Sequence, residues 1–189
     1  MGLFLKLPMH GTEAASPWVC RWTPLIRPAG LVLDLACGGG RHMQWLASQG
    51  HRVLGVDRSP EALALAAAFG PTLQADIESG PWPLTGQHFD AVVVTNYLWR
   101  PLWPHILASV APGGVLVYET FARGHETVGR PSRADFLLAP GELLQVAAQG
   151  GLRVVGYEDG FLGEPERFVQ RIAAVREATS SAPQRWSLA

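Results

Sequence analysis

The chain has 189 residues, nearly half of them apolar, and a formal net charge of −1. This length allows one α/β domain with a substantial buried core. The near-zero charge provides no broad field for holding nucleic acid or an anionic membrane, and no apolar run reaches the roughly 20 residues that a membrane helix needs.

Cysteine usage and the N-terminal stretch bear on the cellular compartment. Cys20 and Cys37 allow at most one disulfide, which is unlike a secreted disulfide scaffold. The stretch MGLFLKLPMHG is too short and too proline-interrupted for a signal peptide. We therefore expect a soluble, cytoplasmic, bacterial protein with no membrane partner, and the low net charge disfavours a nucleic-acid partner.

Residues 1–29 form a lead before the first strand. Within it, Ser16 followed by Pro17 is typical of a helix N-cap and first turn. The helix would place Trp18 and Trp22 one turn apart on one face. Two interpretations are open: the tryptophans bind substrate as an N-terminal lid over the cleft, or they pack against the sheet.

The pattern then alternates between strands and helices. Strands are predicted over residues 31–36, 52–57, 71–76, 89–96, 114–121, 152–162 and 166–177. Helices are predicted over residues 41–50, 59–70, 101–111 and 140–151. Continuous apolar strands separated by helices indicate a parallel sheet covered on both faces, whereas the last two strands, with Gly163 at their turn, must be antiparallel.

The fold class that we predict is therefore α/β. It is a doubly wound, mostly parallel seven-stranded sheet with one antiparallel strand at or near an edge. The domain is expected to span residues 30–178, and the polar tail over residues 179–189 is expected to fray.

The segment LVLDLACGGGRH runs an apolar strand into three glycines. Ligands of doubly wound sheets bind at the carboxyl ends of the strands. A dinucleotide fingerprint would need Gly or Ala where Met43 stands, and no P-loop Gly-Lys-Ser/Thr follows. The next two strands also end in acids: Asp57 could accept hydrogen bonds from ribose hydroxyls, and Asp76 from an adenine amino group beside Ile77.

Five ordered segments, VLDLACGGGR, GVDRS, ADIE, FDAVVVTNYL and LAPGGVLVYET, resemble the successive motifs of class I S-adenosylmethionine (AdoMet)-dependent methyltransferases. The resemblance covers residues 30–177, and Ala36 replaces the first glycine of the family's pattern. It implies a Rossmann-like methyltransferase fold, AdoMet as cofactor and S-adenosylhomocysteine as product. The implied cofactor-binding residues are Asp34, Ala36, Cys37, Gly38, Gly40, Asp57, Arg58, Asp76, Ile77, Asn96 and Tyr97.

By this resemblance the reaction is methyl transfer, and the segment TNYLWRP bears on the acceptor. It lacks the prolines of the motif found in adenine and glutamine N-methyltransferases, and the acids of spermidine synthases. In size and layout the chain is similar to the tellurite-resistance and thiol methyltransferase branch. We expect a small acceptor, anionic or a soft nucleophile, and a monomer or homodimer. An RNA or protein methyltransferase and a non-catalytic AdoMet-binding protein are the alternatives.

The loop over residues 120–140 shows no clear period, as is common in binding loops. A cluster of guanidinium groups there would suit an anionic acceptor; the alternative is ordinary solvated arginines. The candidate acceptor-binding arginines are Arg100, Arg123 and Arg130. The candidate catalytic residues are Tyr97, Glu119 and His125.

Two of these catalytic candidates have an alternative interpretation. Glu119 could face either the cleft or the core, and His125 could be an ordinary loop histidine. The other histidines, His42, His88 and His105, fit helix or loop surfaces, and they show no metal-ligand spacing, so no metal site is expected.

Overall fold

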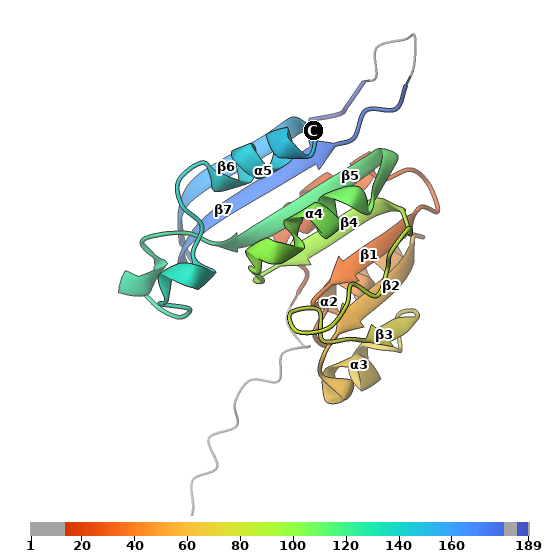
Figure 1. Ribbon diagram of the computed structural model, residues 1–189, viewed down its shortest axis with the longest axis horizontal. Helices are drawn as coiled ribbons and strands as arrows, with labels where there is room; N and C mark the ends of the chain where they lie inside the picture. Colours follow the sequence, from red (N-terminus) through yellow and green to blue (C-terminus); the bar gives the residue numbers. More distant parts are fainter. Residues whose placement is uncertain (1–13, 180–184, 189) are drawn as a thin grey trace, which may run out of the picture.

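The computed structural model describes residues 14–179 and 185–188 (Figure 1). Its centre is a seven-stranded sheet in the order β3-β2-β1-β4-β5-β7-β6. The strands are β1 (Leu31–Leu35), β2 (Arg52–Asp57), β3 (Thr72–Gln74), β4 (Phe89–Thr95), β5 (Val110–Phe121), β6 (Arg153–Gly163) and β7 (Glu166–Val175). The helices are α1 (Pro17–Trp22), α2 (Arg41–Ser48), α3 (Pro60–Ala66), α4 (Trp103–Ala108) and α5 (Glu142–Gln149).

Strand directions confirm the predicted topology. Strands β1 to β5 pair in parallel, and β7 runs antiparallel to both β5 and β6. The reversed strand is therefore β7, one position in from the edge strand β6. This order is that of the Rossmann-like methyltransferase fold.

The two faces of the sheet carry separate hydrophobic clusters. Residues of α1, α2 and α3 pack with one set of strand side chains, and residues of α4 and α5 pack with the other. Successive residues of β1 alternate between the two clusters, as Val32 and Leu33 do, because neighbouring side chains of a strand point to opposite faces. Residues at or just beyond the carboxyl ends of β1, β2 and β4, such as Ala36, Asp57 and Thr95, line surface cavities.

Several element ends differ from the predicted ones. Helix α3 ends at Ala66 rather than at residue 70, and β3 has only three residues, so Asp76 lies in the turn beyond it. Strand β5 begins at Val110, before the predicted residue 114, because Val110 pairs with Phe89 across a shift in register. Short 3-10 turns occupy Thr23–Leu25, Arg100–Leu102, His125–Thr127 and Ala134–Phe136.

Helix α1 belongs to the core. Ser16 caps it by accepting a hydrogen bond from the main-chain N–H of Trp18 at 3.1 Å, as predicted. Trp18 and Trp22 are each only 2% exposed, and the Trp18 indole donates to the carbonyl of Ile172 on β7 at 3.2 Å. Of the two interpretations, packing against the sheet is the one that these contacts support, because both rings are buried in the cluster on that face.

Four further observations concern the chain ends, Trp186, the cysteines and the length of the helices. Residues 1–13, 180–184 and 189 lie outside the described residues. The predictions for the lead over residues 1–29 and for the tail over residues 179–189 fall outside them to that extent. Trp186 packs against the cluster that contains α1. Both cysteines are free thiols, and no helix in the described part of the chain has the length and hydrophobicity needed to cross a membrane.

Candidate active site

The turn between β1 and α2 forms the floor of the candidate site. Ala36 and Gly38 both have positive φ, 56° and 54°. A side chain on Gly38 would meet no atom within 4 Å, so this glycine is required by its conformation and leaves the backbone open to a ligand. A Cβ on Gly40 would instead lie 2.9 Å from Ala66 of α3, so Gly40 allows the close approach of two helices.

Asp57 connects this turn to the end of β2. One carboxylate oxygen accepts the main-chain N–H of Gly38 at 2.9 Å, and the other accepts the N–H of Ser59 at 2.9 Å. Two main-chain bonds fix the carboxylate beside the cavity. A carboxylate oxygen can accept more than one hydrogen bond, so Asp57 retains capacity for a ligand's hydroxyl groups.

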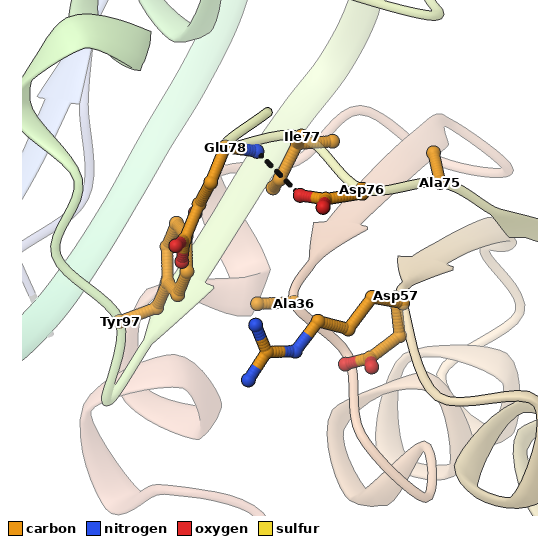
Figure 2. A pocket seen from close by; sticks show the side chains of 8 residues that line it. Ala36, Asp57, Ala75, Asp76, Ile77, Glu78 and Tyr97 are labelled. Carbon is orange, nitrogen blue, oxygen red and sulfur yellow. Dashed lines mark hydrogen bonds between the residues drawn. The ribbon is translucent and has the colours of Figure 1, made fainter. Parts of the chain in front are cut away.

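The first cavity, here called the acidic hollow, has a volume of about 200 Å³. It is lined by Ala36, Asp57, Arg58, Ala75, Asp76, Ile77, Glu78 and Tyr97. Figure 2 shows Asp57 and Asp76, from the ends of neighbouring strands, on one side and Tyr97 opposite. Asp76 accepts the N–H groups of Glu78 and Ser79 at 3.0 and 3.1 Å, and these bonds lower the pKa of its carboxyl.

The second cavity, the arginine hollow, continues the first, because both share Ala36 and Tyr97. Its volume is about 390 Å³. The lining residues are Ala36, Cys37, Gly38, Gly39, Arg41, His42, Thr95, Asn96, Tyr97, Phe121 and Arg130. None of these described residues is acidic and two are arginines, so the cleft has halves of opposite charge.

The turn after β4 contains Asn96 and Tyr97 and lies where the two hollows meet. Asn96 has a φ of 53°, a left-handed conformation that asparagine tolerates better than most residues. Its N–H donates to the carbonyl of Glu119 at 2.9 Å, and the Tyr118 hydroxyl donates to the carbonyl of Tyr97 at 2.8 Å. Burial and the nearby charge of Glu78 raise the pKa of Tyr97, so its phenol stays neutral and is a poor general base.

Asp34 lies beneath the turn and lines neither hollow. It is 1% exposed, and its Oδ2 has no hydrogen-bond partner among the described residues. Burial raises the pKa of Asp34 to about 7; the charge of Arg41 and the N–H of Met43 oppose this shift, whereas the charge of Asp57 adds to it. Asp34 is therefore a partly protonated support for the turn.

Two of the catalytic candidates, Glu119 and His125, have side chains that bond to other residues, although Nδ1 of His125 has no hydrogen-bond partner among the described residues. The Glu119 carboxylate faces the core, where it accepts the Ser16 hydroxyl at 3.0 Å and pairs with Arg171 at 3.3 Å. His125 is buried against Phe121, and its Nε2 donates to the carbonyl of Arg130 at 3.0 Å. Neither side chain lines the two hollows, so neither has the reach of a general base there.

The three candidate arginines lie in two different hollows. Arg130 lines the arginine hollow, but Arg100 and Arg123 line a different, open hollow of about 460 Å³. Arg100 forms two hydrogen bonds to Glu142, at 2.6 and 2.9 Å, and others to main-chain carbonyls. The structure therefore places Arg100 and Arg123 outside the two hollows of the cleft: Arg100 is held by Glu142 of α5, and Arg123 lines the same separate hollow.

His42 was predicted on a surface but is only 2% exposed and lines the arginine hollow. Its position four residues before Leu46, on the buried face of α2 with Met43, is the sequence signal that could have found it. Arg41 and Thr95 also line this hollow and were not selected from the sequence. Helix α2 begins directly after the glycine turn, so its first residues necessarily lie beside the ligand cleft.

Comparison with known proteins agrees with this geometry. A family profile described as a methyltransferase domain matches residues 32–114. An uncharacterized methyltransferase of Synechocystis sp. is 51% identical over 123 residues, which are 59% of this chain and 57% of the relative. The trans-aconitate 2-methyltransferase of Streptomyces avermitilis is 30% identical over 130 residues, 61% of this chain and 48% of the relative. In these matches, in its sheet order and in its glycine turn, the chain is similar to AdoMet-dependent methyltransferases of class I.

Among solved structures, the fold is similar to that of TehB from Haemophilus influenzae. The TM-score is 0.73 at 21% identity, over 88% of this chain and 64% of TehB. At that identity the likeness concerns the fold alone. The chain also spans only about half the length of the two curated relatives, so its own activity and substrate have to be argued from the cleft.

Proposed function

We propose that the chain transfers a methyl group from AdoMet to a small anionic acceptor. The observation that carries this proposal is the division of one cleft into an acidic hollow and an arginine hollow that meet at Ala36 and Tyr97. The hydroxyl and amino groups of a nucleoside donate hydrogen bonds, which the carboxylates of the acidic hollow can accept. An anionic substrate that accepts the methyl group needs cationic hydrogen-bond donors, which the arginine hollow supplies.

The acidic hollow fits the nucleoside part of AdoMet. Asp57 is positioned to accept from the ribose hydroxyls, and Asp76 from the adenine amino group. Ile77 and the Tyr97 ring supply the apolar surfaces that a base requires. Gly38 lets the amino-acid part of the molecule pass close to the backbone on its way to the arginine hollow.

When bound, AdoMet supplies an electrophilic methyl group on its sulfonium. The protein then has to hold the acceptor in line with that methyl group. Tyr97 is a neutral phenol, and Glu119 and His125 line neither hollow, so none of the three candidates serves as a base in the cleft. An acceptor that is already an anion needs no base, which favours a carboxylate, another oxyanion or a thiolate.

Arg130 is the residue that we assign to this acceptor. It lies on the loop after β5, at the part of the arginine hollow formed with Phe121. The hydrogen bond from His125 to the Arg130 carbonyl fixes the main chain at this point. One relative is named for trans-aconitate, a polycarboxylate, which supports an anionic acceptor here.

A two-part experiment tests the proposal. Calorimetric titration with S-adenosylhomocysteine should give one site per chain. A methyl-transfer screen with labelled AdoMet should then show transfer to members of a panel of carboxylates, other oxyanions and thiols, but not to phenols, amines or bulk RNA. Absence of S-adenosylhomocysteine binding would refute the proposal, and transfer to RNA alone would show a nucleic-acid methyltransferase instead.

A further inference from the structure

A chain of hydrogen bonds leads from helix α1 to the wall of the arginine hollow. The main-chain N–H of Ser16 donates to Nε2 of His42 at 3.2 Å. On the other side of the ring, Nδ1 of His42 lies 3.4 Å from the hydroxyl oxygen of Thr95. Thr95 is the last residue of β4, is 8% exposed and lines the hollow together with His42.

The first bond determines the direction of the second. A main-chain N–H can only donate, so Nε2 of His42 must carry a lone pair. Burial, together with the charge of Arg41, lowers the pKa of His42 to about 3, so the imidazole is neutral at physiological pH. A neutral imidazole has one N–H. It is therefore on Nδ1, and the Thr95 oxygen accepts it.

The Thr95 hydroxyl is left with its own hydrogen to donate. Within the described residues, its only side-chain hydrogen bond is the one to His42. The hydroxyl can thus donate to an acceptor atom of a ligand in the hollow. A ligand carboxylate fits this donor.

We infer that the Thr95 hydroxyl donates to the carboxylate of the amino-acid tail of AdoMet, and that His42 and Ser16 are positioning residues for it. This inference rests on the proposed function. Strand order favours the tail over the methyl acceptor: β4 lies beside β1, whose glycine turn the tail would cross, whereas Phe121 and Arg130 belong to β5 and the loop after it. The buried helix α1 would in this way support cofactor binding from outside the cleft.

A comparison of two nucleosides isolates the contribution of the amino-acid tail to binding. S-adenosylhomocysteine carries it, and 5′-methylthioadenosine has the same nucleoside and thioether without it. In calorimetric titrations, Thr95→Val should weaken S-adenosylhomocysteine binding about 10-fold or more, as expected for loss of a hydrogen bond to a charged group. Its affinity for 5′-methylthioadenosine should equal that of the wild type, and Thr95→Ser, which keeps the hydroxyl, should restore binding.

The positioning residues are tested in matched pairs. His42→Leu should show the same selective loss, whereas His42→Asn keeps an amide that can donate near the position of Nδ1 and should recover part of it. Ser16→Pro removes the main-chain N–H at a φ of −56° that proline accepts, whereas Ser16→Ala keeps it. Only Ser16→Pro should weaken S-adenosylhomocysteine binding selectively.

The outcomes separate this inference from the proposed function. If wild-type protein binds both nucleosides but Thr95→Val loses neither, or loses both equally while unfolding at the wild-type temperature, the inference is overturned and the proposed function stands. If neither nucleoside binds the wild type, the proposed function fails and the inference fails with it.

Discussion

The Asp57 carboxylate accepts the main-chain N–H of Gly38 at 2.9 Å across a separation of 19 residues. The same side chain thus fixes the glycine turn and faces the acidic hollow. Asp57 at the end of β2 and Gly38 in the turn after β1 therefore act as a pair, because the carboxylate holds the turn in place beside the hollow that it lines. This pair provides the most direct test of cofactor binding.

Asp57→Ala should weaken S-adenosylhomocysteine binding by about 1–3 kcal/mol, because hydrogen bonds to a charged group are lost. Isothermal titration measures the effect. Asp90→Ala is a matched control: Asp90 also accepts a main-chain N–H, that of Leu31 at 2.7 Å, but at the opposite end of the sheet. It should lower stability and leave binding unchanged. Equal affinities of Asp57→Ala and wild type would remove the ribose assignment.

Asp34 should make the stability of the protein depend on pH. Its pKa is raised from 3.8 to about 7 in the folded protein, so between these values the folded state binds more protons than the unfolded state. The stabilisation is present in full below pH 4 and is lost as the pH rises to about 7, by an amount on the order of a few kcal/mol.

Urea unfolding at a series of pH values measures this dependence, with Asp34→Asn as the comparison. The free energy of unfolding of the wild type, relative to the variant, should fall between pH 4 and pH 7 and then level off. Parallel curves for the two proteins would show that Asp34 titrates normally and is not the buried acid described here.

Trp22 should contribute to stability rather than to turnover. Trp22→Ala should cost about 3–5 kcal/mol, as expected when a large buried aromatic side chain is removed. Gly156→Ala should also destabilise the protein, because a Cβ on Gly156 would collide with the Trp22 ring. Leu65→Ala, at a position 46% exposed, is the control and should change little. Chemical denaturation followed by fluorescence would decide; a stable Trp22→Ala protein with impaired turnover would favour a lid instead.

Arg130 should affect the acceptor and not the cofactor. Once an anionic acceptor is identified by the screen, Arg130→Gln should lower kcat/KM for it about 10-fold or more, since a charge-assisted hydrogen bond is lost. Binding of S-adenosylhomocysteine should stay the same. Arg123→Gln changes an arginine of the same loop that lines the other hollow, and it should leave both quantities unaltered. Similar losses in both variants would mean that general charge, rather than a specific contact, attracts the acceptor.

Much of the fold could be predicted because its signals are local. Ser16 and Ser59 cap helices as predicted, and both hydroxyls accept the expected main-chain hydrogen bonds. The glycine turn after β1 and Asp57 at the end of β2 line the cavities at the carboxyl ends of the strands, as the alternation of strands and helices predicts. Element ends were less predictable: β5 begins four residues early because Val110 finds a partner in Phe89, which no local pattern reveals.

The sequence by itself determined the order of the strands and helices, the reversed strand pair and the turn that defines the class of cofactor, since periodicity and turn chemistry depend on near neighbours. Only the tertiary structure decided which side chains line the cleft. It buried Trp18 and Trp22, turned Glu119 to Ser16 across 103 residues of sequence, and separated Arg130 from Arg100. These outcomes depend on contacts between distant segments, which form only when the sheet brings the segments together.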